Sequence, residues 1–179
     1  LAQRLLVQPG DEAARVAARR GYRVTLFERA ERLGGQIELA AAPPRKAEIM
    51  RSVEYYERVL PELGVDVRLG TAAGPADLEG FDAAIVAVGA SNVTLPVPGS
   101  DRDNVVSAWD VLAGRVVPEG RVAVIGGGLV GTETAEYLLA RGCEVSIVEM
   151  LDKIAEGESG TVLPTIMAEF AERGVEQLT

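Results

Sequence analysis

Histidine is absent from this chain of 179 residues, and cysteine occurs once, as Cys143. Without histidine, the chain can form neither a Ser-His-Asp triad nor a histidine-based metal site, so a general acid or base would have to be Asp, Glu, Lys or Tyr. A single thiol excludes an intramolecular disulfide, a Cys-x-x-Cys redox pair and a cysteine-ligated iron–sulfur cluster within the chain. We therefore predict no catalytic residue and no metal ligand, and we expect any redox chemistry to belong to a bound cofactor.

Long apolar runs and an excess of basic residues are also missing. No stretch of about 18 consecutive apolar residues occurs, so we expect no transmembrane helix, and residues 1–4 do not resemble the start of a signal peptide. Lys and Arg number 18 against 27 Asp and Glu, which gives a net charge of -9. Nucleic acid and anionic membranes would repel such a surface. We expect a cytoplasmic protein whose partners are small molecules.

An internal repeat with an offset of 121 residues organises the chain. Residues 20–28 resemble residues 141–149, and the same offset pairs Gly10 with Gly131. Each copy has a short apolar strand, an alanine-rich helix and a second strand that finishes on Glu; the first strands are residues 5–7 and 122–125. Such βαβ units form parallel sheets, so we predict an α/β chain with two nucleotide-binding-like units.

Hydrophobic periodicity predicts further elements outside the repeats. Residues 46–63 have the spacing of an amphipathic helix, which Pro61 should disturb in its last turn and Gly64 should end. Residues 65–69 alternate like a half-buried strand, and the continuous apolar run 83–88 is typical of a central parallel strand. We also expect a crossing between domains at 91–103, a short helix at 108–112, a helix at 161–173 interrupted by Pro164, and a strand beginning at 175–178.

A glycine loop joins the strand at 122–125 to a predicted helix at 129–140; it reads Gly126-Gly127-Gly128-Leu129-Val130-Gly131. Gly126 allows the sharp turn out of the strand, Gly128 lets the backbone approach a pyrophosphate, and Gly131 lets the helix pack close to the sheet. The first backbone N–H groups of the helix would then point at the phosphates. This context predicts a Rossmann-type dinucleotide site, and the alternative is a glycine-rich turn without a ligand.

Glu149 ends the next strand, 21 residues beyond Gly128, close to the usual offset of about 20 for the acidic ribose ligand. A carboxylate can accept hydrogen bonds from both hydroxyls of the adenosine ribose, and it repels a 2′-phosphate. Met150 and Leu151 offer that phosphate no cation, and Lys153 is the nearest one. We therefore predict a preference for NAD(H) over NADP(H).

The corresponding loop in the first copy is three residues shorter. Two residues separate Val7 from Gly10, whereas five separate Ile125 from Gly131. Either this loop is degenerate and binds phosphate weakly or not at all, or the sequence omits some of its residues. Glu28, which corresponds to Glu149, could still bind a ribose, and the alternative is an ordinary charged strand end.

Taken together, these motifs resemble the C-terminal FAD/NAD region of the NADH:flavin oxidoreductase and 2,4-dienoyl-CoA reductase family, flavoproteins related to old yellow enzyme and trimethylamine dehydrogenase. The matching segments cover nearly the whole chain and are residues 12–21, 24–36, 82–90, 104–112 and 122–152. The resemblance implies two Rossmann-like, FAD/NAD(P)-binding parallel-sheet units, both incomplete. An FAD- or ADP-binding domain would occupy residues 1–100, and a truncated NAD-binding domain residues 101–179.

Site residues follow from the resemblance, position by position. It implies FAD or ADP ligands at Gly10, Glu28, Arg29, Gly35, Gln36 and Gly89, and NAD ligands at Gly126, Gly127, Gly128, Leu129, Val130, Gly131 and Glu149. Val88 departs from the family pattern, because it replaces the usual Thr and removes a hydroxyl that would contact the flavin. Paired glycines at 34 and 35 would let the backbone lie flat against a ligand, although a plain turn also explains them.

The same resemblance implies a fragment of a larger enzyme. In the family, FMN and an iron–sulfur cluster belong to an N-terminal barrel that has no counterpart here. The intact protein would pass hydride from NADH to FAD and electrons onward to a separate centre. The alternative is a redox-inactive module that binds ADP or NAD. Exposed sheet edges lead us to expect self-association or dependence on the missing barrel.

Overall fold

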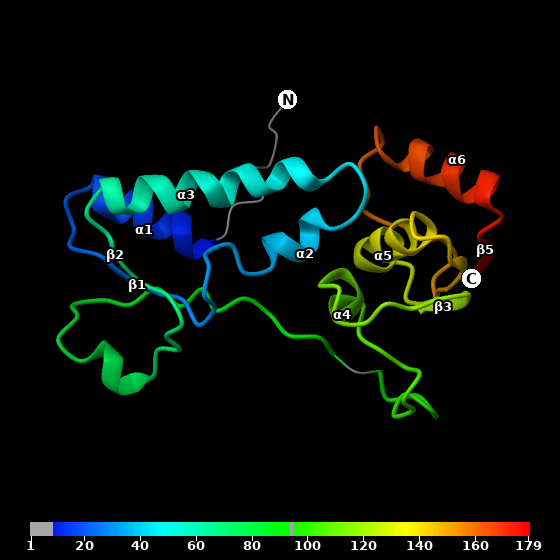
Figure 1. Cartoon of the computed structure of the whole chain (residues 1–179), viewed down its shortest axis with the longest axis horizontal. Helices are drawn as coiled ribbons and strands as arrows, with labels where there is room; N and C mark the ends of the chain where they lie inside the picture. Colours follow the sequence, from blue (N-terminus) through cyan, green and yellow to red (C-terminus); the bar gives the residue numbers. More distant parts are fainter. Residues whose placement is uncertain (1–8, 94) are drawn as a thin grey trace. The chain divides into compact units, whose positions relative to one another are not determined.

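The computed structural model describes residues 9–93 and 95–179, which form two compact units (Figure 1). The first unit extends to Ala41 and continues from Ala47 to Ser91; the second comprises Ala42–Lys46 and Asn92–Thr179. Each unit combines helices with one small parallel sheet. The predicted α/β fold with two parallel sheets is therefore confirmed.

The first unit is built around two long helices and a two-stranded sheet. Its elements are α1 (Pro9–Arg19), β1 (Thr25–Phe27), α2 (Ile37–Ala41), the 3-10 turn η1 (Ala47–Ile49), α3 (Met50–Glu62), β2 (Asp66–Arg68) and the 3-10 turn η2 (Pro75–Leu78). Strands β1 and β2 pair in parallel, with Leu26 opposite Val67. Helices α1 and α3 lie side by side (Figure 1), and Val53 and Leu60 of α3 are fully buried in the core.

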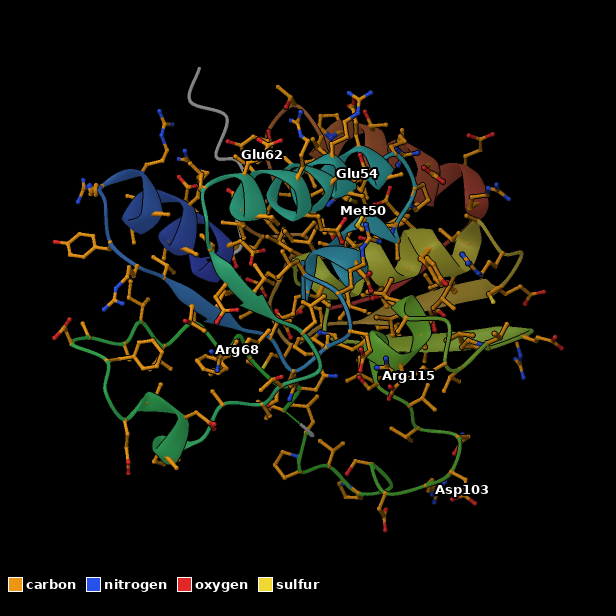
Figure 2. All side chains as sticks on the ribbon, turned by 60° about the vertical axis from the view of Figure 1, so that its left-hand side comes forward. Met50, Glu54, Glu62, Arg68, Asp103 and Arg115 are labelled. Carbon is orange, nitrogen blue, oxygen red and sulfur yellow. The ribbon has the colours of Figure 1, made fainter. Side chains whose placement is uncertain are left out.

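Helix α3 is shorter at its start than the sequence predicts, because residues 47–49 form a 3-10 turn before it. Met50 and Glu62 mark its two ends (Figure 2). Pro61 does not disturb the helix before its end, since the last turn is closed by the N–H of Gly64, which donates to the carbonyl of Pro61 at 2.9 Å. Gly64 has a φ of 75°, which is the left-handed conformation that ends the helix as predicted.

The apolar segment 83–88 is not a strand, contrary to the prediction. Ile85, Val86 and Val88 are 71%, 78% and 86% exposed. An apolar run becomes a buried strand only when neighbouring strands supply its hydrogen bonds. In the described part of the first unit, β1 pairs with β2 and the segment stays extended and unpaired. The other predicted strand, residues 5–7, and the start of the first glycine loop lie outside the described residues.

The second unit contains a three-stranded parallel sheet. Its elements are α4 (Ala108–Leu112), β3 (Arg121–Ile125), α5 (Leu129–Leu139), β4 (Glu144–Val148), α6 (Leu163–Arg173) and β5 (Glu176–Leu178). The strand order is β3-β4-β5, and Val124 lies opposite Ile147, which lies opposite Gln177. Ile147 and Phe170 of α6 are fully buried. The core of this unit therefore lies around the central strand and the helices that follow β3 and β4.

The helices predicted at 108–112 and 161–173 are both present. The predicted short helix at 108–112 is confirmed as α4, and the side chain of Ser107 caps it by accepting from the N–H of Trp109 at 3.1 Å. Helix α6 begins at Leu163, so Pro164 lies in its first turn and interrupts nothing, because a first-turn residue needs no N–H donor. None of the helices in residues 9–93 and 95–179 is long and apolar enough to span a membrane.

A five-residue segment, Ala42–Lys46, belongs to the second unit although the residues on either side of it belong to the first. Arg45 forms ion pairs with Glu136 of α5 and, at 3.2 Å, with Glu169 of α6, and Lys46 pairs with Glu133 of α5. Glu136 is only 3% exposed, and this burial raises its pKa, while Arg45 opposes the rise. The segment is therefore held on α5 and α6 by charges.

Candidate functional site

The glycine loop of the second unit connects β3 to α5 through a turn that only glycine adopts easily. Gly126 has a φ of 97°, and its N–H donates to the carbonyl of Val148 at 2.8 Å. Gly128 is the N-cap residue of α5, with an extended backbone. The chain thus leaves the sheet at Ile125 and enters the helix at Leu129, as the sequence predicts.

Two positions of this loop have no room for a side chain. A Cβ on Gly131 would lie 1.8 Å from the carbonyl oxygen of Gly126, and a Cβ on Gly127 would lie 2.6 Å from Cγ2 of Ile154. The carbonyl of Gly127 accepts from the N–H of Ala155 at 2.6 Å and from the hydroxyl of Thr132 at 3.1 Å. The loop is therefore packed tightly on its inner side and held by its neighbours.

The outer side of the loop is open. A Cβ on Gly128 would have no neighbour within 4 Å, and Leu129 and Val130 are exposed. Gly128, the N-cap residue of α5, makes no side-chain cap hydrogen bond. The first backbone N–H groups of a helix lack partners within the helix, and they favour anions. Open space in front of such groups is what the phosphates of a dinucleotide need.

Glu149 lies beside this loop and is held by backbone donors on both carboxylate oxygens. Its Oε1 accepts from the N–H of Leu151 at 2.9 Å, and its Oε2 accepts from the N–H of Gly127 at 2.7 Å. These two N–H groups hold the pKa of Glu149 below its ordinary value. The side chain is half-buried and stays ionised at neutral pH.

The residues of the second unit fit a dinucleotide. The tight inner side, the open outer side and the ionised Glu149 all lie around one turn, and the structure brings together the seven residues predicted for NAD. Thr132 was not among the predicted residues, and its buried hydroxyl supports the loop from the inner side. Thr132 directly follows Gly131, and this position in the sequence could have indicated that it supports the loop.

In the first unit, the structure brings Gln36 and Gly89 together. Nε2 of Gln36 donates to the carbonyl of Ala90 at 3.1 Å, and a Cβ on Gly89 would lie 3.0 Å from the same nitrogen. Gly89 has a φ of 73°, and Gly35 has a φ of 45° and is exposed. The side chain of Gln36 therefore lies against Gly89, and the exposed Gly35 is the glycine of this pair that a flat ligand such as a flavin could approach.

Glu28, Arg29 and Gly10 complete the residues predicted for FAD or ADP. Glu28 follows β1, and its Oε1 accepts from the N–H of Ala30 at 2.8 Å, while Arg29 is exposed. Gly10 lies in the first turn of α1, where an added Cβ would be 3.5 Å from the Cβ of Ala87. Glu28 therefore bonds locally, in the way that Glu149 bonds to Leu151.

The sequence profile of the pyridine nucleotide-disulphide oxidoreductases matches residues 10–179. The chain belongs to this family. Bilirubin reductase of Mediterraneibacter gnavus (strain CC55_001C) is 49% identical over 172 residues, which cover 95% of this chain and 27% of that protein. NADH oxidase of Thermoanaerobacter brockii is 42% identical over 176 residues, which cover 95% of this chain and 27% of that protein.

A solved structure of 2-naphthoyl-CoA reductase in complex with 2-naphthoyl-CoA superposes on this member of the pyridine nucleotide-disulphide oxidoreductases with a TM-score of 0.89. The two are 27% identical in sequence, and the match covers 97% of this chain and 26% of the reductase. The chain thus spans about a quarter of the length of the relatives it matches.

Asp11, in the first unit, carries an acidic group at a place where a phosphate-binding site would not be expected to have one. Asp11 lies in the first turn of α1 and is 3% exposed, and its Oδ2 has no hydrogen-bond partner in the part of the chain that the structure describes. Burial, and to a lesser extent the charge of Glu28, raises the pKa of Asp11 to about 6. The sequence prediction missed Asp11, although the repeat aligns it with Thr132 and so places an acid where the second copy has a hydroxyl.

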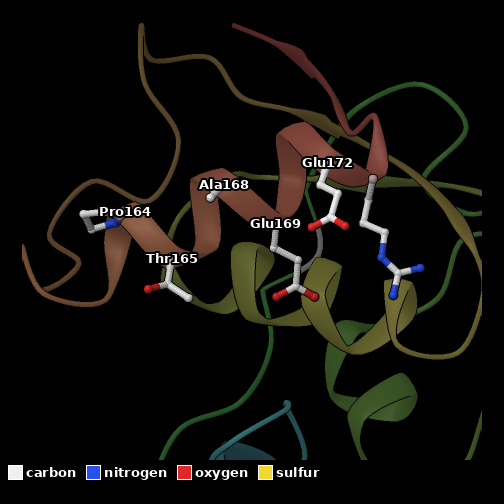
Figure 3. Close-up of a pocket in the computed structure, with 6 residues that line it drawn as sticks. Pro164, Thr165, Ala168, Glu169 and Glu172 are labelled. Atoms are coloured by element: carbon white, nitrogen blue, oxygen red, sulfur yellow. The ribbon is translucent and has the colours of Figure 1, made fainter.

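A pocket also lies along α6 (Figure 3), but it contains none of the predicted ligands. Its lining includes the carboxylates of Glu169 and Glu172. Glu169 already pairs with Arg45. Arg173 also lines this pocket, but none of the residues predicted to bind a nucleotide does, so we do not assign the nucleotide to it.

Proposed function

We propose that this chain is the FAD- and NAD-binding part of an NADH-dependent flavoprotein oxidoreductase of the NADH:flavin oxidoreductase and 2,4-dienoyl-CoA reductase type. The observation that carries the proposal is the hydrogen bond from the N–H of Gly127 to Glu149, because it holds a ribose-binding carboxylate beside an open glycine turn. The relatives named NADH oxidase and bilirubin reductase support an oxidoreductase.

The second unit would hold NADH through two groups of atoms. The first N–H groups of α5 would face the diphosphate, with Gly128 leaving the space that it needs. Glu149 would accept hydrogen bonds from the hydroxyls of the adenosine ribose. Its negative charge would repel a 2′-phosphate, and the exposed Met150 and Leu151 offer no compensating cation.

The first unit would hold FAD, with Gln36 and Gly89 beside the flavin and Glu28 toward the ribose. NADH, when bound, supplies a hydride; FAD, when bound, accepts it and passes electrons to a centre in another part of the protein. By family resemblance, that part is a barrel with FMN and an iron–sulfur cluster. We propose that the intact protein works in the cytoplasm.

A reconstitution experiment tests the proposal. The chain is mixed with FAD, freed of unbound flavin, and examined for the flavin band at about 450 nm. NADH is then added with an artificial electron acceptor, and its oxidation is followed. We expect the band and NADH oxidation, and we expect Gly128→Ala to keep the band but to lose most of the NADH oxidation. Absence of both the band and the oxidation in the unsubstituted chain would refute the reductase function.

A second candidate is a redox-inactive module that binds ADP or NAD, and the shortened first loop, with two residues between Val7 and Gly10 where the second copy has five, favours it. This candidate predicts binding of ADP or NAD by calorimetry without oxidation of NADH. The same reconstitution therefore separates the two functions.

A further inference from the structure

Asp11 is a buried acid at the point where a helix normally favours a phosphate. It lies in the first turn of α1, a helix of 11 residues, and its Oδ2 has no partner among the described residues. Burying a polar group without a hydrogen bond destabilises a fold, so a buried, unpartnered carboxyl oxygen needs an explanation. Neither of the functions above uses this group.

The internal repeat supplies the comparison. Gly10 corresponds to Gly131, so Asp11 corresponds to Thr132. In the second unit, the hydroxyl of Thr132 donates to the carbonyl of Gly127 and thereby supports a loop that is open to a diphosphate. An ionised carboxylate cannot donate a hydrogen bond, whereas a protonated carboxyl can. The first unit thus has, at the same position, a group that resembles threonine only when it carries a proton.

We propose that the protonation of Asp11 controls whether the first unit accepts a diphosphate, so that the ADP half of FAD binds only when this carboxyl is neutral. The inference rests on the proposed FAD site of the first unit. Its physical basis is charge: a buried carboxylate within the first turn of α1 would repel the phosphates that the same turn attracts. Binding therefore takes up one proton from the solvent, which converts the carboxylate to the acid, and no other bond changes.

The charged and titratable groups around Asp11 decide whether the pH dependence of FAD binding can be attributed to it. Glu28, after β1, adds a second negative charge, and Tyr56 of α3 also interacts electrostatically with Asp11. Tyr56 stays neutral because burial and the hydrogen bond to Glu12 raise its pKa. On α1 itself, Glu12 is paired with Arg15 and has a lowered pKa. The chain has no histidine, the side chain whose ordinary pKa lies between about 5 and about 8.

Calorimetric titration of the full chain with FAD, and separately with ADP, tests the proposal. Since the pKa of Asp11 is about 6, we expect Kd to be nearly constant below that pH and to rise about tenfold for each pH unit above it. Titrations at about pH 8 in buffers of different ionisation enthalpy should show uptake of close to one proton per FAD. Asp11→Asn should bind FAD at about pH 8 roughly 100-fold more tightly than the unsubstituted chain, with no pH dependence.

Glu62→Gln is the matched control, because it removes one negative charge from an exposed position at the end of α3 (Figure 2). It should leave both the affinity and its pH dependence unchanged. Asp11→Thr introduces the residue found at this position in the second copy, and we expect it to behave like Asp11→Asn. It serves as the second variant if the Asp11→Asn protein does not fold. Equal FAD affinity and equal pH dependence in the unsubstituted chain and a folded Asp11 variant would overturn the inference alone. Absence of FAD binding by every variant at every pH would overturn the FAD site together with it, whereas the NADH site is tested independently at Glu149.

Discussion

At the scale of single residues, two glycines of the same loop have different tasks, and substitution separates them. Gly131 has no space for a Cβ, whereas Gly128 faces open space. We expect Gly131→Ala to destabilise the second unit by more than about 2 kcal/mol, because backbone atoms must move. Gly128→Ala should change the free energy of unfolding by less than about 0.5 kcal/mol but weaken NADH binding at least about tenfold.

Urea unfolding and NADH titration of both variants measure these effects. If Gly128→Ala bound NADH as tightly as the unsubstituted chain, the diphosphate would not lie at this turn. If Gly131→Ala were as stable as the unsubstituted chain, the tight packing of the loop would be wrong.

Glu149 is predicted to select the nucleotide. Its pKa is lowered by the N–H groups of Leu151 and Gly127, so it is ionised above its ordinary pKa range and loses its charge only as the pH falls through the lowered pKa. We expect Glu149→Ala to weaken NADH binding about tenfold or more, and to weaken NADPH binding less because repulsion of the 2′-phosphate disappears. Calorimetry with both nucleotides measures the difference, and equal losses would contradict the role of Glu149.

Single residues also show where sequence reasoning succeeds and where it stops. The glycine loop and Glu149 were predictable, because the spacing of these residues follows from the geometry of a strand, a turn and a helix. The bond between Gly127 and Glu149 was not, since a local pattern does not say which donor a side chain uses. Asp11 was missed because an acid in a helix's first turn is ordinary in a sequence, and only the structure reveals its burial.

At the scale of elements, the segment Ala42–Lys46 depends on charges. Arg45→Ala would leave the buried Glu136 without its closest cation, and we expect a loss of about 1–3 kcal/mol in the free energy of unfolding, at the low end because Arg45 itself is half exposed. Arg51→Ala is the matched control, since Arg51 pairs with Glu48 on the surface, where both side chains are exposed, and should cost less than about 0.5 kcal/mol.

Urea unfolding at about pH 7 compares the two variants. Burial raises the pKa of Glu136, so its ionisation opposes folding, and removing Arg45 should increase that opposition as the pH rises. An Arg45→Ala protein that is as stable as the Arg51→Ala control would mean that the segment is held by packing, with the buried Pro43 as the candidate.

Most helices and strands were predictable, because their periodicity is local. Helices α4 and α5 begin where the sequence predicts. Segment 83–88 was predicted wrongly because strand pairing is decided by residues far away in the sequence, and apolar character alone does not supply a partner. The effect of Pro164 was misjudged because the helix begins at Leu163, two residues later than predicted, and helix ends are the least predictable part of a pattern.

At the scale of the whole molecule, exposed apolar residues predict association. Ile85, Val86 and Val88 are exposed on a segment that pairs with no strand among the described residues, so it presents apolar side chains together. We propose that the isolated chain self-associates through this segment. Sedimentation velocity should show an average mass that rises with concentration, and the double substitution Val86→Lys, Val88→Lys should reduce that rise.

Val117→Lys is the control for the association experiment, because Val117 is exposed in the second unit and lies outside the segment. It should not change the concentration dependence. A chain that stays monomeric over the whole concentration range would exclude self-association.

The two backbone bonds of Glu149 have a further consequence for nucleotide choice. A carboxylate oxygen has about two positions at which it can accept a hydrogen bond. In Glu149, each oxygen already uses one of them, for the N–H of Gly127 or of Leu151. The N–H of Met150 also lowers the pKa of this carboxyl, so few positions remain for the two hydroxyls of an unmodified ribose. A deoxyribose would leave one position to water, and a 2′-phosphate would replace a donor by an acceptor. The backbone bonds of Glu149 therefore limit the number of further hydrogen-bond donors that it can accept. Discrimination between nucleotides at this residue then depends on the number of donors that the sugar offers.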